Sequence, residues 1–589
     1  MFDISKKLKK ADAAPLLMTD GVVNCDTLKC PMSGYDPYAS LMRADLLVAL
    51  ITVIYLLGYF LYSSFLAKKI FKLDDNKKTP AHELEDGNDF VPTRKWILFG
   101  HHYASIAGVA PIIGPCIAVY WGWLPALTWV VLGNIFMGAV HDMGILLLSV
   151  RNKAQSLAEV AGQFLPKKSK IALLFIIVFL LWIVTAAFSV VIARLFVTYP
   201  SSVLPTIIAS ILALIMGQIL YRSKLHALVP SLIALALLYA SIPLGVKYPI
   251  DLTLWFEPGI ATAIWVLVLL IYAFIASVLP VWVLLQPRDY INSHQIIVGL
   301  GILVIGIFVT KPEMVAPMIN FEAERSWFPF LFITVACGAI SGAHGLVASG
   351  TTAKQINKES DIRPIAYGGM LLEGFLALLA VIAASAGFAN NEGWCEHYGS
   401  WAHASRHGLD AFVQGSVSFM THFNLGPEIA AAFIAVIIIS FAATSLDTLF
   451  RIQRYMLEEI SVLVKFKPLG NRYIASLLAV ATVSMMVYSD GITKVEGAFT
   501  LWPLFGTTNQ LLASLALMIL ALFLMELGSN NLYVLIPGII LTILTMIANT
   551  MGVMDFWRDA NYLLAAFAVL VLFLQLYIVK DISRSLLKK

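Results

Sequence analysis

The 589-residue chain has little charge, and this shortage decides its class. Only 13% of the residues are charged, whereas 59% are hydrophobic, and the mean hydropathy is +0.82. A soluble domain does not need so much apolar surface, so the composition indicates a membrane protein. Strand-like alternation of polar and apolar residues is missing as well, which excludes an outer-membrane barrel and leaves helices as the spanning elements.

The chain also has few cysteines and lacks a nucleotide-binding motif. Five cysteines, two of them in apolar segments, do not make a disulfide scaffold. Cys25, Cys30 and Cys395 are expected on the oxidising side of the membrane, where a Cys25–Cys30 bridge would leave Cys395 over. The chain contains no phosphate-binding P-loop, which argues against transport driven by ATP bound to this chain. Residues 1–43 are mostly polar, so we expect no cleavable signal peptide.

What the chain does contain is a series of apolar segments, each long enough to cross a hydrocarbon core of roughly 30 Å as a helix. Fifteen such spans are predicted, at 44–67, 98–121, 122–149, 169–196, 204–221, 226–246, 260–286, 290–310, 328–353, 366–388, 427–450, 472–489, 497–527, 530–548 and 561–579. An odd number of spans places the two ends of the chain on opposite sides of the membrane. Lys and Arg concentrate in the connections that share a side with the C-terminus, which is therefore expected to be cytoplasmic. The basic sequence SKKLKK near the start argues the other way.

Two of the apolar segments are interrupted by glycine and proline. The first, GHHYASIAGVAPIIGP, covers 100–115, and the second, CGAISGAHGLVASGTTAK, covers 337–354. Proline donates no backbone hydrogen bond, so such breaks free carbonyl groups for a ligand or ion. One broken segment alone favours tight packing of small residues, but two, each with buried polar groups, indicate a transporter site at mid-membrane. The candidate substrate-binding residues are Ala107, Gly108, Pro111, Gly114, Gly338, Ser341, Gly342, His344 and Thr351.

The first broken segment also has a property of its own. A half-helix that begins near Ile112 would attract a carboxylate through the dipole of its N-terminus.

The predicted spans divide the chain into an extracytoplasmic tail at 1–43, an all-α transporter domain at 44–527 with its broken helices at 98–121 and 328–353, and a C-terminal helix pair at 528–589. An outer loop interrupts the transporter domain at 389–426.

Ionisable side chains are rare inside the spans, and each costs roughly 2.5–3.5 kcal/mol to insert, so each is a functional candidate. His101, His102, His141, Asp142 and Glu373 are predicted at similar depths in three different spans. We expect them to form one polar cluster that carries a proton at neutral pH. The alternative is that the outer member of each adjacent pair reaches to the membrane interface.

A second set of polar groups lies in the span at 427–450. Thr444, Asp447 and Thr448 share one helix face, and their oxygens would suit a sodium ion or a proton opposite the opened carbonyls of a broken helix. The alternative is an intrahelical ion pair between Asp447 and Arg451, four residues further on.

The outer loop holds His403 and His407, which are one helical turn apart. Such a pair can bind a metal weakly. The alternative is a short amphipathic helix that lies over the outer surface.

Four stretches of the chain together resemble the carbon starvation protein (CstA) family: VPTRKWILFGHHYASIAGVAPIIGP, LPVWVLLQPRDYI, FPFLFITVACGAISGAHGLVASGTT and LWPLFGTTNQLLA. The similarity covers most of residues 44–527. It implies a bacterial or archaeal cytoplasmic-membrane carrier for nutrients such as peptides or, in one branch, pyruvate taken up with protons. It also implies a fold similar to the LeuT-type inverted repeat, with 98–121 and 328–353 as the two discontinuous helices.

Within that resemblance, Thr444 and Ser445 are similar to the hydroxyl pair of LeuT-type sodium sites, so sodium coupling stays open beside proton coupling. The candidate coupling residues are His101, His102, His141, Asp142, Glu373, Thr444, Ser445 and Asp447. The chain departs from the long family members in three ways. It lacks an initial hydrophobic span, has His141 where they tend to carry glutamine, and has a shorter outer loop.

The leading functional hypothesis is a secondary transporter that imports small carboxylate-bearing nutrients by symport with H⁺ or Na⁺. Its partners are the lipid bilayer and a small-molecule substrate, with no nucleic acid and no cofactor apart from the coupling ion. The alternative from another class is a membrane oxidoreductase, because His101 or His102 could face His141 as axial haem ligands. A passive channel would also explain the broken helices, but it would assign no function to the buried carboxylates.

Overall fold

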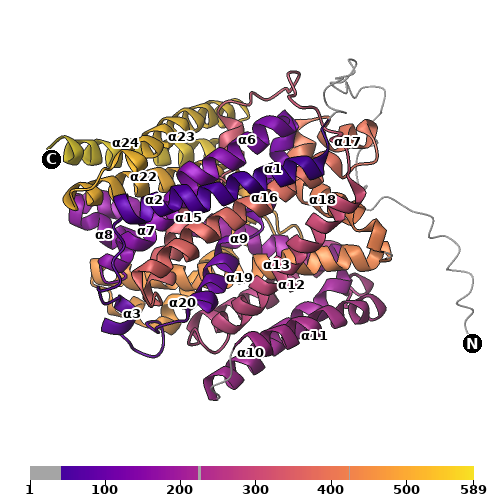
Figure 1. Ribbon diagram of the computed structural model, residues 1–589, viewed down its shortest axis with the longest axis horizontal. Coiled ribbons are helices and arrows are strands. Elements are labelled where there is room, and N and C mark those ends of the chain that lie inside the picture. The colour runs from indigo at the N-terminus through magenta and orange to yellow at the C-terminus, as the bar shows by residue number, and fades with distance from the viewer. Residues whose placement is uncertain (1–41, 223–226, 424, 589) are drawn as a thin grey trace, which may run out of the picture.

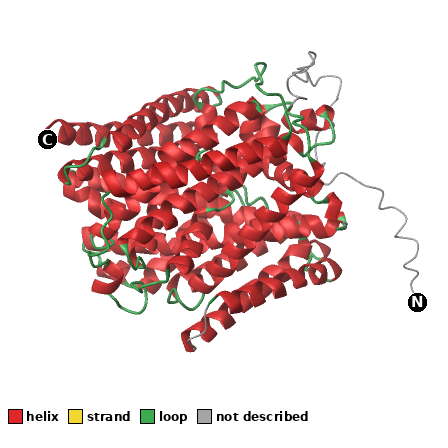
Figure 2. Cartoon of the chain, in the orientation of Figure 1, coloured by secondary structure: helices red, strands yellow, loops and turns green. Residues whose placement is uncertain are grey.

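The computed structural model describes residues 42–222, 227–423 and 425–588, and helices are the only regular elements in these ranges (Figure 2). Twelve helical segments there are long and apolar enough to cross a membrane. The fold class predicted from the sequence, an all-α polytopic membrane protein, is confirmed. The segments are Ala44–Ile70 (α1, η4, α2, η5), Trp123–Arg151 (α6, η7, α7), Lys167–Thr198 (α9), Pro200–Leu220 (η8 and most of α10), Leu228–Leu254 (α11, η9), Pro258–Val278 (α12), Leu285–Thr310 (α13), Glu359–Ala386 (η11, η12, α16), Pro427–Val464 (α19), Gly497–Glu526 (α21, η15, α22), Leu532–Arg558 (α23) and Tyr562–Lys588 (α24).

The remaining three of the fifteen predicted spans are helical but differ in length or continuity. The span predicted at 98–121 is a bent pair, which brings the number of spans to thirteen when it is counted as one. The span predicted at 328–353 consists of two short helices, and the one at 472–489 is the 16-residue α20 (Arg472–Val487). The count of fifteen was therefore approximate.

One boundary error matters for the site. The span predicted at 260–286 ends at Val278, because Leu279 precedes Pro280 and takes the extended conformation that a following proline imposes. Helix α13 then begins at Leu285, so Arg288 and Asp289 lie in its first turns and are buried rather than forming part of an exposed connection.

The first broken helix is α4 (Lys95–Ile106) followed by α5 (Ala110–Ala118) and η6 (Val119–Trp121), with a bend of 49° at the break. Helix α5 begins at Ala110, two residues earlier than predicted. Pro111 occupies its first turn, where a missing N–H costs no helical hydrogen bond and the fixed φ angle suits the helix.

The second broken helix is α14 (Phe330–Thr334) followed by α15 (Gly342–Gly350), with an irregular segment at 335–341 between them. Gly338 has a φ of +89° in that segment, a conformation that L side chains rarely adopt. Both predicted breaks are therefore present in the structure.

The two broken helices run antiparallel to each other. Helix α5 contacts α14, and α4 contacts α15, so the second half of one lies beside the first half of the other. The contact is close: a Cβ added to Gly114 would lie 2.4 Å from the carbonyl oxygen of Thr334, and one added to Gly338 would lie 3.7 Å from Pro111 Cβ. The two breaks therefore meet near the middle of the bundle.

The other helices surround this pair (Figure 1). The hairpin of α10 (Val203–Arg222) and α11 (Leu228–Lys247) packs on α13 at one edge of the bundle. At the other edge α23 and α24 pack on α22 (Phe505–Glu526). One end of the bundle carries α17 (Asn391–Tyr398) and α18 (Trp401–Phe419), and we call it the α18 end. The opposite end, the α3 end, carries α3 (Pro80–Glu83), α8 (Leu157–Phe164) and the C-terminus.

Close helix packing gives a first testable prediction. Gly306 and Gly301 lie five residues apart in α13, but a Cβ on Gly306 would come within 2.5 Å of the Phe419 carbonyl oxygen, whereas one on Gly301 would meet nothing within 4 Å. Gly306→Ala should lower the free energy of unfolding by about 1–3 kcal/mol through overpacking. Gly301→Ala should be neutral or slightly stabilising because alanine favours the helix.

Thermal unfolding of the two variants in the same detergent makes the comparison. Equal melting temperatures for the two variants would contradict the close approach of α13 to the end of α18.

Candidate functional site

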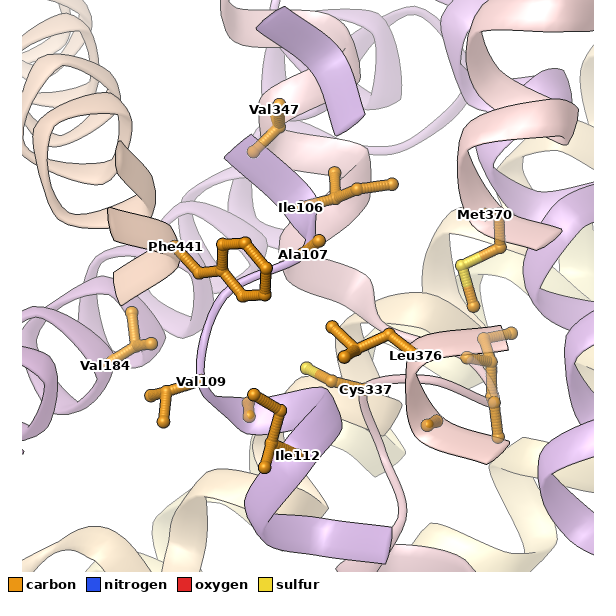
Figure 3. Packing of buried hydrophobic residues seen from close by; sticks show 14 of the residues in the cluster. Ile106, Ala107, Val109, Ile112, Val184, Cys337, Val347, Met370, Leu376 and Phe441 are labelled. Carbon is orange, nitrogen blue, oxygen red and sulfur yellow. The ribbon is translucent and has the colours of Figure 1, made fainter. Parts of the chain in front are cut away.

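The break of the first helix faces the break of the second across the centre of the bundle. Figure 3 shows Ala107 and Val109 on the turn between α4 and α5, and Ile112 in the first turn of α5. Cys337 of the second break and Phe441 of α19 lie on either side of this turn. All five side chains are buried. Ala107 thus lies at the break of the first helix, and Pro111 lies in the first turn of α5 near Gly338 of the second break. Their role in substrate binding stays a prediction.

Several backbone groups at the second break are bound by side chains from neighbouring helices. Trp129 Nε1 donates to the Val335 carbonyl at 3.1 Å, Asn134 Nδ2 donates to the Gly338 carbonyl at 2.8 Å, and the Gly338 N–H donates to Glu373 Oε1 at 3.1 Å. Asn509 Oδ1 accepts from the N–H of Ala343 at 2.9 Å, in the first turn of α15. These contacts replace the helical hydrogen bonds that the break removes, and sequence reasoning had singled out only Glu373 and Gly338 among these groups.

Three of the candidate glycines are positions of close packing. A Cβ at Gly108 would meet Phe188 and Ser445 at 2.9 Å, and one at Gly342 would meet the backbone of α22 at 2.4 Å. Gly114, as described above, meets Thr334. The small side chains therefore let the broken helices approach their neighbours.

Two candidate hydroxyl residues already have protein partners. Ser341 Oγ lies 3.2 Å from Asn509 Oδ1 and accepts from Asn509 Nδ2 at 3.0 Å, while Thr351 Oγ1 donates to the Val347 carbonyl at 3.0 Å. In this conformation both groups hold the second broken helix together.

A first group of buried ionisable side chains, the Asp142 cluster, joins α7 (Ala139–Arg151), α15 and α16 (Gly369–Ala386). Asp142 Oδ1 lies 2.7 Å from His141 Nδ1, and its Oδ2 lies 3.0 Å from His344 Nδ1. His344 Nε2 lies 3.3 Å from Glu373 Oε2. The sequence predicted His141, Asp142 and Glu373 as neighbours. It placed His344 among the substrate residues, whereas the structure places it between the two carboxylates.

A second group, the Arg288 cluster, lies where α13 meets α4, α12 and α19. The Arg288 guanidinium donates to the Asp447 carboxylate and contacts the Tyr272 hydroxyl, which donates to Asp447 Oδ2 at 2.7 Å. Asp289 Oδ2 lies 2.5 Å from His101 Nδ1. The single polar cluster expected from the sequence is therefore two, because His101 turns toward α13. The ring of His102 instead places its Nδ1 2.9 Å from Thr352 Oγ1.

The hydroxyl face of α19 contacts the first broken helix directly. Ser445 Oγ donates to the Ser105 carbonyl at 2.9 Å, Thr448 Oγ1 lies 3.0 Å from Ser105 Oγ, and Thr444 Oγ1 accepts from Asn292 Nδ2 at 2.6 Å. The predicted juxtaposition of α19 with the freed carbonyls of α4 is present.

The intrahelical ion pair considered between Asp447 and Arg451 is not formed, because Asp447 pairs with Arg288 of α13 instead. Arg451 instead donates to Asp89 Oδ1 at 3.2 Å and to the Ala276 carbonyl at 2.9 Å. The signal for Arg288 and Asp289 was present in the stretch LPVWVLLQPRDYI. The predicted boundary between two spans left both residues in a connection.

The α3 end of the site is closed by charged groups that we call the Asp89 seal. Asp89 precedes α4 and binds Arg451 and Tyr455, the latter at 2.7 Å, while the Lys354 ammonium lies 3.5 Å from the centre of the Tyr455 ring. Burial lowers the pKa of Lys354 to about 8 against the opposing effect of Asp89. Burial alone would raise the pKa of Asp89, but Lys354, Arg451 and Arg454 hold it below its usual value.

The α18 end is closed by aromatic side chains. The rings of Trp121 and Trp401 lie 5.0 Å apart, Trp121 Nε1 donates to the Arg325 carbonyl at 2.7 Å, and the Arg325 guanidinium lies 5.1 Å from the Trp401 ring. Helix α18 packs on α5, so it covers the first broken helix. The amphipathic helix considered for the outer loop is therefore present.

His403 and His407 stack in α18 with ring centroids 4.2 Å apart. Their Nδ1 atoms lie 3.0 Å from the His397 carbonyl and from Asp410 Oδ2, respectively. Metal binding by this pair stays a prediction. Cys395 in α17 is disulfide-bonded, whereas Cys25 and Cys30 lie outside the described residues.

Comparisons with known proteins agree with the family resemblance. The sequence model described as carbon starvation protein CstA matches residues 43–391 and 390–548. A peptide transporter CstA of Helicobacter pylori is 33% identical over 82% of this chain and 78% of its own length, and one of Bacillus subtilis is 33% identical over 88% and 91%. The pyruvate/proton symporter BtsT of Escherichia coli is 36% identical over 56% of this chain and 48% of its own length.

Among solved structures, a manganese transporter of Eremococcus coleocola covers 85% of this chain and 99% of its own at 14% identity and a TM-score of 0.43. MhsT in complex with L-phenylalanine covers 77% and 98% at 14% identity and a TM-score of 0.42. At these scores the likeness adds nothing to the fold described above. The predicted LeuT-type repeat therefore stands on the sequence resemblance and on the antiparallel broken helices.

The Arg288–Asp447 pair gives a second prediction. Both side chains are buried, and removing one charge leaves the other uncompensated, which typically costs about 3–5 kcal/mol. Arg288→Met and Asp447→Asn should each lower stability by that amount, and the double variant should be more stable than either single variant.

The matched control is the exposed pair Arg194–Glu496, where Arg194→Met and Glu496→Gln should each change stability by about 0–1 kcal/mol. Thermal unfolding of all the variants gives the coupling energy. Additive losses in the buried pair would show that the two charges do not compensate each other.

Proposed function

The chain belongs to the carbon starvation protein CstA family, and from this membership and the geometry of its site we propose that it is a secondary active transporter. It imports small carboxylate-bearing nutrients, either peptides or pyruvate-like acids, across a bacterial or archaeal cytoplasmic membrane in symport with a proton. The named relatives are transporters, and the alternative of a membrane oxidoreductase finds no support among them.

The observation that carries the proposal is the meeting of two antiparallel broken helices at mid-bundle, with a seal at each end. The substrate site lies between the Ala107–Val109 turn and the 335–341 segment, and the N-terminus of α5 at Ala110 points its dipole toward a substrate carboxylate. The Asp89 seal closes the cytoplasmic side and the Trp121–Trp401 contact closes the outer side. Opening one seal at a time gives alternating access.

The Arg288 cluster supports a proton rather than a sodium ion as the coupling ion. A sodium ion between α4 and α19 would need the oxygens of Asp447, Ser445 and Ser105, but the Arg288 guanidinium already neutralises Asp447, and Ser445 already donates to the Ser105 carbonyl.

The proton is held by the buried His101–Asp289 pair. His101 Nδ1 lies 2.5 Å from Asp289 Oδ2, and its Nε2 has no hydrogen-bond partner. Arg288, Asp447 and Tyr272 border this pair. Histidine is the side chain that most often carries exchangeable protons in proteins, and the position of His101 on the first broken helix would link its protonation to the opening of the substrate site.

Uptake into proteoliposomes tests this proposal. An inward proton gradient should drive accumulation of labelled pyruvate or a labelled dipeptide, and a sodium gradient alone should not. His101→Gln and Asp289→Asn should each abolish proton-driven accumulation but keep counterflow exchange of the substrate, because exchange moves no net proton.

His294→Gln on α13 is the control, since His294 is only partly buried and its ring bonds the Tyr290 carbonyl. It should accumulate substrate like the unaltered protein. Accumulation driven by sodium, or undiminished proton-driven accumulation by Asp289→Asn, would refute the assigned coupling. Parallel assays with pyruvate and with dipeptides decide between the two substrate classes.

The Asp89 seal gives a further prediction. Asp89→Asn removes the carboxylate that Arg451 and Tyr455 bind, and a hydrogen bond to a charged group contributes about 1.5–3 kcal/mol. Opening at the cytoplasmic side should become at least about tenfold more frequent, measured by faster amide hydrogen exchange in residues 86–94.

Glu458→Gln is the control, because Glu458 pairs with Arg454 on the same helix and bridges no other element in that contact. Its exchange at 86–94 should match that of the unaltered protein. No change in Asp89→Asn would show that the seal does not govern the cytoplasmic gate.

A further inference from the structure

Three side chains of different chemical types converge at the second break. Cys337 of the irregular segment, His344 of α15 and Glu373 of α16 each offer one ligand atom, and these atoms all lie within 4.8 Å of one another. All three residues are buried, and the Cys337 thiol is free. Thiolate, imidazole and carboxylate are together the ligand types of zinc sites in proteins.

Two of the converging atoms face each other without a hydrogen bond. His344 Nε2 and Glu373 Oε2 lie 3.3 Å apart, within ion-pair distance, but neither atom makes a hydrogen bond. The His344 side chain is 3% exposed and the Glu373 side chain is 0% exposed. Nitrogen and oxygen ligands at 2.0–2.2 Å from a tetrahedral zinc ion lie roughly 3.3–3.5 Å apart. The observed separation of an imidazole nitrogen and a carboxylate oxygen thus fits two ligands that share one ion, as well as a direct ion pair.

Each of the three side chains is also held from behind. His344 Nδ1 lies 3.0 Å from Asp142 Oδ2, Glu373 Oε1 accepts from the Gly338 N–H at 3.1 Å, and Cys337 Sγ accepts from Asn509 Nδ2 at 3.6 Å. A carboxylate that binds the second ring nitrogen of a histidine, and so fixes the direction of the first, is a usual partner of metal-bound histidine.

The charge of the site also favours a cation. Asp142 and Glu373 are both buried, and within the described part of the chain neither has a Lys or Arg partner. Buried carboxylates are normally paired with a positive charge or bound to a metal. In the Arg288 cluster the same need is met by a guanidinium, whereas in the Asp142 cluster only imidazoles are present.

We propose that Cys337, His344 and Glu373 bind one Zn²⁺ ion, with Asp142 as the residue that positions His344. Three protein ligands leave the fourth position of a tetrahedral ion for a water molecule or another small ligand. The ion ties the irregular segment of the second broken helix to α15 and α16, so it fixes the break in the closed arrangement of this structure. This inference does not depend on which nutrient or coupling ion the transporter uses.

Metal binding to the purified full-length protein tests the proposal. The protein, freed of any affinity tag and of metal by a chelator, is incubated with Zn²⁺ or Co²⁺, desalted and measured for bound metal. One equivalent per chain is expected. Co²⁺ should give the near-ultraviolet absorption of a cobalt–thiolate bond together with the visible bands of tetrahedral cobalt, and Zn²⁺ should raise the melting temperature.

The chain offers a matched control for the thiol. Cys337→Ser should remove the cobalt–thiolate band and weaken binding at least 100-fold. Cys116→Ser should change neither, because Cys116 is the other free buried cysteine among the described residues and its thiol donates to the Ala380 carbonyl at 3.3 Å. Glu373→Gln should also weaken binding, and Asp142→Asn should do so by about 10–100-fold, as expected for a positioning residue.

The double variant His403→Ala and His407→Ala separates this site from the outer histidine pair and should keep the full equivalent of metal. Binding that survives both Cys337→Ser and Glu373→Gln, or that is lost with the outer histidines, would overturn the proposal. So would the absence of a thiolate band in the unaltered protein. Size-exclusion profiles of every variant confirm that a loss of metal is not a loss of fold.

Discussion

A backbone N–H or C=O group left without a partner inside a membrane costs several kcal/mol, and a broken helix exposes several of them at once. The second break of this protein exists because Trp129, Asn134, Glu373 and Asn509 supply the missing hydrogen bonds from four neighbouring segments. The packing around the break follows from that need. Helices α6, η7, α16 and α22 must stand close enough to reach it, and glycines at positions such as 342 allow the approach. The opened region that a substrate site requires is thus maintained by polar side chains that are not themselves part of it.

Much of the fold and the approximate location of the site could be predicted from the sequence. The uninterrupted apolar runs determine the spans. The pairing of Gly108 with Pro111 and of Gly338 with Gly342 marks the breaks correctly, whereas single prolines such as Pro243 and Pro537 leave their apolar helices unbroken. Depth along a helix also placed Asp142 and Glu373 together. The direction of a side chain around its helix was not predictable: adjacent residues point about 100° apart, so His101 and His102 reach different partners. Arg288 was missed because a boundary error of a few residues left it in a connection, and the partners of the break were missed because Trp129, Asn134 and Asn509 are unremarkable until the helices are packed.

The two buried clusters differ in how their negative charge is compensated, and this difference gives them different properties. In the Arg288 cluster a permanent cation neutralises Asp447, and the neighbouring Asp289 lies beside His101, the pair to which the proposed function assigns the coupling proton. The Asp142 cluster has two carboxylates and no permanent cation among its partners in the described residues. Within the cluster only a protonated imidazole can supply positive charge, and His344 lies between the two carboxylates. Because the cluster adjoins the second break, a change in its charge would act on the geometry of the proposed substrate site.

This division also bears on how the two broken helices move. The first break is tied to α13 and α19 through Asp289, Ser445 and Thr448, whereas the second is tied to α7, α16 and α22 through Asp142, Glu373 and Asn509. The two sets of contacts share no residue, but they do not separate the two broken helices. His102 of α4 also bonds Thr352 at the end of the second broken helix, and Cys116 of α5 donates to the Ala380 carbonyl of α16. A motion of one group against the other would keep the hydrogen bonds within each group. It would have to change the contacts that cross between them, such as His102–Thr352, together with the surface between the breaks, where the proposed substrate site lies.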